Sequence, residues 1–303
     1  MLKRDKLFEI ATQASAGITI VLIAGILIFL LINSWTVIDD FFSSLFSVSE
    51  WDPENNIFRP VSSIYGTLMT TAIAIVLAIP LSLIMALFLV EMTRPRLRSF
   101  FSLVVDLLAA IPSIIFGIWG LFVFVPFVSG YIQPVLQSLF PGFTLFSGPL
   151  TGIGIFTAGI ILAIMITPFM AAALRDVFIM IPSHLKEAAY SSGATTWDVT
   201  RGITMKFGLR GAVGAAIIGL GRAIGETMAV AFVIGNSHQI KASLFAPGHT
   251  ITTTLLNEFL QASEGIYFKS LVGLALILFL LSAAVQSVLQ LWLVRFRKSI
   301  NIA

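Results

Sequence analysis

Arg222 and Glu226 are the two residues of this chain whose types and spacing suggest chemistry with an ion. Both lie in a long apolar run, residues 208–235, and Arg222 is about 13 residues, or about 20 Å, into a helix over that run. That depth is close to the centre of a bilayer, where a charged side chain costs about 2.5–3.5 kcal/mol and requires a partner or a water-filled cavity. Glu226 follows one helical turn later on the same face. The pair is either an internal ion pair that holds helices together, or a guanidinium that offers planar donors to an oxyanion while Glu226 orients it.

Four other polar residues are candidates for the same path. Asp106 and Ser113 are seven residues apart on one predicted helix and share a face. Thr67 and Thr71 are one turn apart on another. Each has a plainer interpretation, because Asp106 is near the predicted inner surface and can be a solvated or paired carboxylate. Threonines, in turn, commonly hydrogen-bond backbone carbonyls in membrane helices.

No other pattern suggests catalysis or metal binding. The chain has no cysteine, and its three histidines, His184, His238 and His249, are scattered without ligand spacing. It also has no G-x-x-x-x-G-K-[ST] phosphate loop, so the chain is not expected to be an ATPase itself. We therefore expect no catalytic residue, no metal and no cofactor in this chain, and we do not interpret it as an enzyme.

The elements that must position these residues are transmembrane helices. Of the 303 residues, 57% are hydrophobic and only 11% are charged, whereas a soluble domain usually has about a quarter charged residues. A membrane-spanning helix requires about 20 apolar residues, and six runs qualify. These runs are residues 14–36, 64–91, 99–128, 150–174, 208–235 and 268–294. The sequence therefore predicts an all-α integral membrane protein with six helices in a single transmembrane domain, residues 1–303.

Lysine and arginine indicate the orientation of these helices. Most of them fall before the first run, at residues 92–98, at residues 175–210 and after residue 294. Because positive charge is enriched on the cytoplasmic side, both termini are predicted to be cytoplasmic. The net charge of +3 is spread over these short clusters, which indicates orientation in the lipid bilayer rather than nucleic-acid binding. The predicted outer loops are residues 37–63, 129–149 and 236–267.

The long cytoplasmic segment, residues 175–207, has its own helix signals. Ser183 is a suitable N-cap for a short helix, and Gly193 is expected to end it in the left-handed conformation. Thr195 and Asp198 have the spacing of a capping box at the start of a second helix. On these signals alone, the segment is either an amphipathic connector or a docking element.

One motif in that segment decides between the two. Glu187-Ala188-Ala189, followed by Gly193, resembles the EAA loop of ABC importer permeases in type, spacing and place before the penultimate helix. The resemblance implies that these four residues contact a separate ATPase subunit and transmit its closure to the membrane helices. The usual Leu-Pro at the end of the motif is replaced here by Met205-Lys206, so the turn into the next helix is expected to differ.

Two further stretches narrow the resemblance. Residues 221–236 and 109–120 are similar to the permease subunits of phosphate ABC importers. Within that family, Met228-Ala229-Val230 differs from the proline-containing continuation typical of the PstA kind. The resemblance implies inward conduction of inorganic phosphate across a bacterial cytoplasmic (inner) membrane. It also implies a heterodimer with a PstA-like permease, an ATPase dimer that binds ATP and Mg²⁺, and an extracytoplasmic phosphate-binding protein. A permease for another small oxyanion, or a secondary transporter or channel, is the alternative.

Overall fold

Helices form every long element of the protein. The computed structural model describes residues 2–44, 51–53, 55–262 and 265–300, and no β-strand occurs within these ranges. Residues 45–50 and 263–264, which belong to two predicted outer loops, and the ends of the predicted 1–303 domain lie outside the described residues. The predicted all-α membrane fold is confirmed.

Five helical stretches are long and apolar enough to cross a membrane. They are Asp5–Ile38, Val61–Met92, Ser113–Leu139, Ile155–Ile179 and Ile266–Leu291. A sixth is obtained if Thr196–Leu209 and Gly211–Ile224, which are bent by 57° relative to one another, form one span. The described chain thus contains five spans, or the predicted six if the bent pair forms one span.

The long elements have the following bounds. They are α1 (Leu2–Ser44), α2 (Val61–Leu87) with the π-helix η1 (Phe88–Met92), α3 (Pro95–Ala109), α7 (Ile155–Ile179), α10 (Met205–Ile224) and α13 (Ile266–Ile300). Between α3 and α7 lie α4 (Ser113–Trp119), η2 (Gly120–Phe124), α5 (Val125–Phe127), η3 (Val128–Ile132), α6 (Gln133–Leu139) and η4 (Thr144–Phe146). The short elements α8 (Ser183–Ser191), α9 (Thr196–Val199) and η5 (Thr200–Thr204) precede α10, and α11 (Met228–Ala231) and α12 (Ile251–Glu258) follow it.

The predicted third helix, residues 99–128, is wrong in its bounds. The chain breaks at residues 110–112, because Pro112 has no amide hydrogen to donate and is extended, with ψ 137°. Residues 95–109 form the separate helix α3, and the apolar span runs from Ser113 to Leu139. Much of the predicted outer loop 129–149 is therefore helical, and Asp106 and Ser113 do not share one helix face.

The predicted fifth helix, residues 208–235, also ends early. α10 stops at Ile224, and the one-turn helix α11 begins only at Met228. Gly225, a poor helix former, stands at the break. Glu226 therefore lies in the break between two helices instead of one turn above Arg222.

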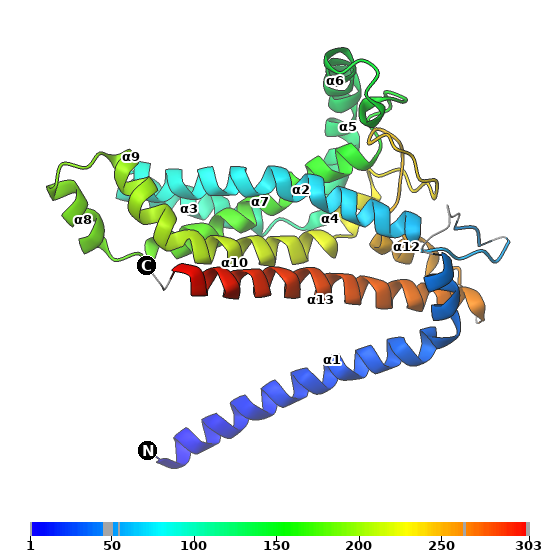
Figure 1. Ribbon diagram of the computed structural model, residues 1–303, viewed down its shortest axis with the longest axis horizontal. Coiled ribbons are helices and arrows are strands. Elements are labelled where there is room, and N and C mark those ends of the chain that lie inside the picture. The colour runs from blue at the N-terminus through cyan, green and yellow to red at the C-terminus, as the bar shows by residue number, and fades with distance from the viewer. Residues whose placement is uncertain (1, 45–50, 54, 263–264, 301–303) are drawn as a thin grey trace.

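The core of the bundle is built around α7. Ile161, Leu162 and Ile166 are fully buried, and α7 packs closely along α2. Gly159 permits this approach, since a Cβ there would lie 2.7 Å from the Cβ of Ile73. α1 diverges from the bundle in Figure 1 and packs near its far end, where Phe41 joins a buried cluster with Leu274 of α13.

The ends of the long helices agree with the charge pattern. The start of α1 and the end of α13 lie at the same end of the molecule as α8 and α9 (Figure 1). α12 and the start of α13 lie at the opposite end. The segments rich in lysine and arginine are therefore gathered at one end of the bundle.

Candidate functional site

α8 carries the predicted coupling motif at one end of the molecule. None of its residues is buried, and Glu187 and Ala188 are exposed while Ala189 is half-buried. Pro182, rather than the expected Ser183, is the N-cap, and Ser183 is the first helical residue without a side-chain cap. An exposed short helix of this kind is suited to docking in the groove of another protein.

The end of α8 follows the local sequence signals. Gly193 has φ +84°, in the left-handed region where glycine avoids the Cβ penalty. The amide of Ala194 donates to the carbonyl of Ala189 at 3.1 Å. Thr195 and Asp198 form the predicted capping box, in which each side chain receives a backbone amide of the other residue. The two helix boundaries of this segment were thus predictable from adjacent residues.

Arg222 lies in the last turn of α10, and not in mid-helix as predicted. Its guanidinium carbon is 5.3 Å from the ring centroid of Phe169 on α7. Its Nε is buried and has no hydrogen-bond partner, and within the described chain no carboxylate forms an ion pair with Arg222. The positive charge is therefore held against an aromatic face without being neutralised.

Glu226 does not contact Arg222 through an ion pair or hydrogen bond in the described chain, so neither the internal ion pair nor the orienting contact, the two alternatives for this pair, is found. Because the helix ends at Ile224, the i, i+4 relationship is lost. The Oε1 of Glu226 instead accepts the amide of Ala229 at 3.2 Å in the first turn of α11. Its carbonyl accepts the hydroxyl of Thr252 at 2.8 Å. Glu226 thus stabilises the break after α10 and leaves Arg222 without a counter-charge.

The two threonines of α2 differ in their contacts. The hydroxyl of Thr67 donates to the carbonyl of Ser63 at 2.8 Å and accepts the amide of Ile251 at 3.0 Å, which ties α12 to α2. The hydroxyl of Thr71 is buried without a partner in the described chain. Thr67 is therefore occupied in the fold, whereas Thr71 retains a free donor and acceptor. Their place in a substrate path stays a prediction.

Asp106 and Ser113 are separated by the break before α4. Both carboxylate oxygens of Asp106 accept from Nη1 of Arg175, at 3.0 and 3.1 Å. The Asp106 side chain is half-exposed, whereas that of Arg175 is 10% exposed. Ser113 is the first residue of α4 and is half-buried. Asp106 is thus a paired carboxylate, as its plainer interpretation predicts. No hydrogen bond or ion pair joins it to Arg222 in the described chain.

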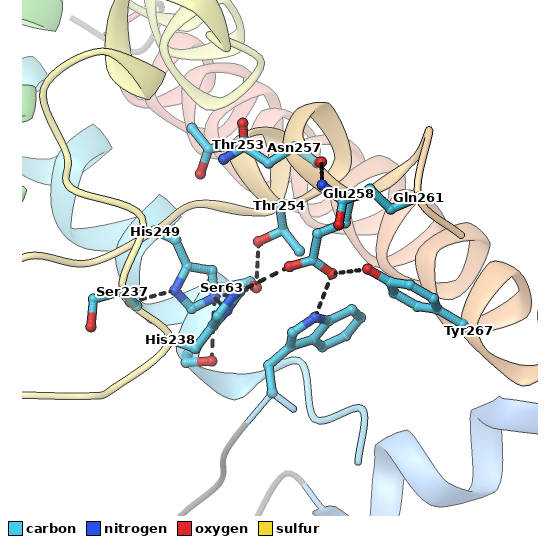
Figure 2. A network of polar contacts seen from close by, with 12 residues as sticks. Ser63, Ser237, His238, His249, Thr253, Thr254, Asn257, Glu258, Gln261 and Tyr267 are labelled. Atoms are coloured by element: carbon cyan, nitrogen blue, oxygen red, sulfur yellow. Dashed lines mark hydrogen bonds and ion pairs between the residues drawn. The ribbon is translucent and has the colours of Figure 1, made fainter. Parts of the chain in front are cut away.

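A polar network at the other end of the molecule was not predicted (Figure 2). Nδ1 of His238 lies 3.2 Å from Nε2 of His249, and Nε2 of His238 lies 3.1 Å from Oε1 of Glu258. The other oxygen of Glu258 accepts from Nε1 of Trp51 at 2.7 Å and from the hydroxyl of Tyr267 at 3.0 Å. No adjacent signal in the sequence indicates that these residues, between 51 and 267, meet.

Burial and hydrogen bonding together determine the charge states in this network. Burial lowers the pKa of His249 to about 4, and the charge of His238 acts in the same direction. Burial alone would raise the pKa of Glu258, but hydrogen bonds from His238, Trp51 and Tyr267 outweigh it and hold that pKa below its usual value. His249 is therefore neutral and Glu258 ionised near pH 7. Among the described residues, no group of three or more His, Cys, Asp or Glu side chains is arranged to hold a metal.

The described chain is an all-helical bundle with five or six candidate membrane spans and an exposed helix, α8, at one end. The family described as "Binding-protein-dependent transport system inner membrane component" matches residues 78–298. Two relatives, each named "Phosphate transport system permease protein PstC", are 45% identical in Mesorhizobium japonicum and 44% identical in Haemophilus influenzae. The first match covers 96% of this chain and 90% of the relative, and the second covers 97% of this chain and 95% of the relative.

The chain therefore belongs to the PstC family of ABC importer permeases. It is a transport subunit and not an enzyme, as predicted, and the predicted resemblance to permease subunits of phosphate ABC importers is confirmed. A bacterial alginate ABC transporter, solved with a periplasmic protein that holds an alginate pentasaccharide, has the same fold. The TM-score is 0.63 at 20% identity, with 98% of this chain and 96% of that chain covered.

Proposed function

We propose that this chain conducts inorganic phosphate from the outside to the cytoplasm as one permease of an ATP-driven importer. The observation that carries this proposal is the guanidinium of Arg222, which has a buried Nε without a partner and no carboxylate bound to it. A cation that is partly buried among helices without a counter-charge is costly, and a passing anion would lower that cost. The names of the PstC relatives support phosphate as that anion.

Phosphate suits the chemistry of this position. A guanidinium offers planar, paired donors that match two oxygens of a phosphate. Thr71 provides a second buried group without a partner. Ala74, one turn from Thr71, and Ala223, next to Arg222, belong to one buried cluster that includes residues of both α2 and α10. We place Arg222 near the membrane midplane, with Glu226 in the break after α10 and Ser113, at the start of α4, on the same proposed path.

The coupling role of α8 is the second part of the proposal. Glu187, Ala188, Ala189 and Gly193 would seat in a separate ATPase subunit on the cytoplasmic side, where both termini of this chain would also lie. The ATPase dimer would bind ATP and Mg²⁺, and its closure would move the helices between inward- and outward-facing states. A PstA-like permease would complete the channel, and a phosphate-binding protein would deliver the substrate in the bacterial inner membrane.

Uptake by a reconstituted importer tests the substrate and Arg222 together. The chain would be assembled in vesicles with its partner permease, ATPase and binding protein, and ATP-driven uptake of radiolabelled phosphate would be measured. We expect Arg222→Gln to assemble normally and to lose uptake by at least about tenfold, the effect of a lost charge-assisted bond. Arg96→Gln, an exposed arginine on α3, is the matched control and should transport normally.

The outcomes separate the parts of the proposal. Wild-type uptake of molybdate or sulfate but not of phosphate would retain the importer and reject phosphate as the substrate. Normal uptake by Arg222→Gln would show that this arginine is structural. ATP-independent uptake by this chain alone would favour a channel or secondary transporter instead.

A further inference from the structure

Two π-helices meet beside the exposed helix α8. η1 ends the long helix α2, and η5 leads into α10. π-helical turns are rare in proteins, and those that occur often lie at functional sites. η1 is held from outside its own helix, because Arg98 of α3 donates through Nε to the carbonyl of Leu89 at 3.0 Å and through Nη2 to that of Val90 at 2.5 Å.

Glu91 joins these elements through a single carboxylate oxygen. Its Oε1 lies 2.6 Å from Nζ of Lys186 on α8 and accepts the hydroxyl of Thr204 on η5, also at 2.6 Å. The side chain of Glu91 is 6% exposed and that of Lys186 is 17% exposed. The whole of Thr204 is buried. The three residues therefore form a short, largely dry connection between α2, α8 and α10.

α8 depends on this connection for its attachment. Across the described chain, Lys186 is the one residue of α8 whose side chain forms a hydrogen bond or ion pair outside α8. The helix is otherwise exposed or half-buried. Without the bond to Glu91, a partner that moved α8 would tilt this helix while α2 and α10 stayed in place.

We propose that Glu91, Lys186 and Thr204 form the link by which movement of α8 is transmitted to α2 and α10. The inference rests on the proposed coupling of α8 to an ATPase and assigns three positioning residues to it. A buried, charge-assisted contact resists separation, because its energy weakens when either partner moves away. Thr204 passes the same displacement to α10, whose last turn holds Arg222. α8 and the turn that holds Arg222 are thereby connected through packed helices.

The test is the number of phosphate ions taken up for each ATP hydrolysed by the complete importer in vesicles. In Glu91→Gln the amide binds Lys186 more weakly, and we expect the ratio to fall by about tenfold, within the range of measured couplings between sites. Thr204→Val should lower the ratio in the same direction. Thr200→Val, a buried threonine on the same π-helix with no bond to Glu91, is the matched control and should keep the wild-type ratio.

A charge exchange distinguishes a link from a purely structural pair. Glu91→Lys combined with Lys186→Glu restores the contact with its charges reversed, and it should recover uptake per ATP relative to either single change. Assembly would be measured by pull-down of the ATPase, since a merely structural role would lower the amount of complex and not the ratio. If Glu91→Gln does not assemble, the link is tested by the uptake per ATP of Thr204→Val compared with that of Thr200→Val.

A wild-type ratio in assembled Glu91→Gln and in Thr204→Val would overturn the link. The wild-type vesicles test the proposed function separately, because absence of phosphate uptake there rejects phosphate while leaving the link measurable. In that case the ratio is taken for whichever oxyanion the vesicles carry.

Discussion

Nε2 of His238 lies 3.1 Å from Oε1 of Glu258 and joins the loop after α11 to α12. The same carboxylate holds Trp51, which precedes α2, and Tyr267, at the start of α13 (Figure 2). His249 adds α2 to this set, because its Nε2 lies 2.8 Å from the hydroxyl of Ser63. One network therefore fastens five segments at the end of the bundle opposite α8: the residues before α2, α2 itself, the loop after α11, α12 and the start of α13.

This network predicts that the protein loses stability in mild acid. The pKa of His249 is about 4 in the folded chain and 6.5 when unfolded, so the unfolded chain binds the proton first. Stability should fall as the pH drops from 6.5 toward about 4, by at most about 3 kcal/mol. Glu258 acts in the same direction at lower pH, because its ionised form is the one that the fold stabilises. Thermal unfolding in detergent between pH 7.5 and 4.5 measures the effect.

The acid sensitivity should be specific to His249. His249→Gln is expected to melt at a lower temperature at pH 7.5 but with a flatter dependence on pH, because it has no proton to gain. His184→Gln, an exposed histidine on α8, should keep the wild-type dependence. An unchanged slope in His249→Gln would contradict the assignment.

Gly66→Ala should displace the outer loop from α2. A Cβ at residue 66 would lie 1.8 Å from the carbonyl oxygen of His249, and a backbone atom cannot move aside without shifting the loop. We expect a loss of about 1–3 kcal/mol, as for other overpacked cores, with a lower melting temperature. Gly25→Ala on α1 has nothing within 4 Å and should be neutral or slightly stabilising. Equal melting temperatures for the two variants would argue against this packing.

Local signals in the sequence predicted α8 and its C-terminal end, whereas the contacts between distant residues could not be read from the sequence. Gly193 and the Thr195–Asp198 box act on neighbouring residues, so their geometry follows from the chain itself. The break after Ile224 depends on Glu226 reaching the amide of Ala229 and on Thr252 reaching the carbonyl of Glu226. Gly225-Glu226-Thr227 is only a short interruption in a long apolar run, so the pattern of apolar residues predicted one continuous helix through it.

The distant pairs were beyond sequence reasoning for the same reason. Lys186 and Glu91 are 95 residues apart, and Trp51 and Glu258 are 207 residues apart. Each side chain, taken alone, resembles an ordinary surface or interfacial residue. Only the packing of α2 against α7, α10 and α12 brings the partners together.

Asp106→Asn distinguishes a substrate role of Asp106 from its bond to Arg175. Because the Asp106 side chain is 49% exposed, loss of the ion pair should cost only about 1 kcal/mol. We expect a slightly lower melting temperature and an unchanged half-saturating concentration for phosphate in the uptake assay. Asp176→Asn, at the other carboxylate bound to Arg175, should behave alike. A large rise in that concentration for Asp106→Asn alone would place Asp106 in the path.

Glu187→Ala should separate coupling from folding. Glu187 is exposed and, within the described chain, its side chain forms no hydrogen bond or ion pair, so its removal should change stability by less than about 0.5 kcal/mol. Phosphate uptake should nevertheless fall by about tenfold if Glu187 binds the ATPase. Glu9→Ala, an exposed glutamate on α1 at the same end of the molecule, is the matched control and should transport normally. Because both variants remove one exposed carboxylate, a loss confined to Glu187→Ala identifies α8 as the docking element. Equal uptake by the two variants would instead reduce α8 to a surface connector.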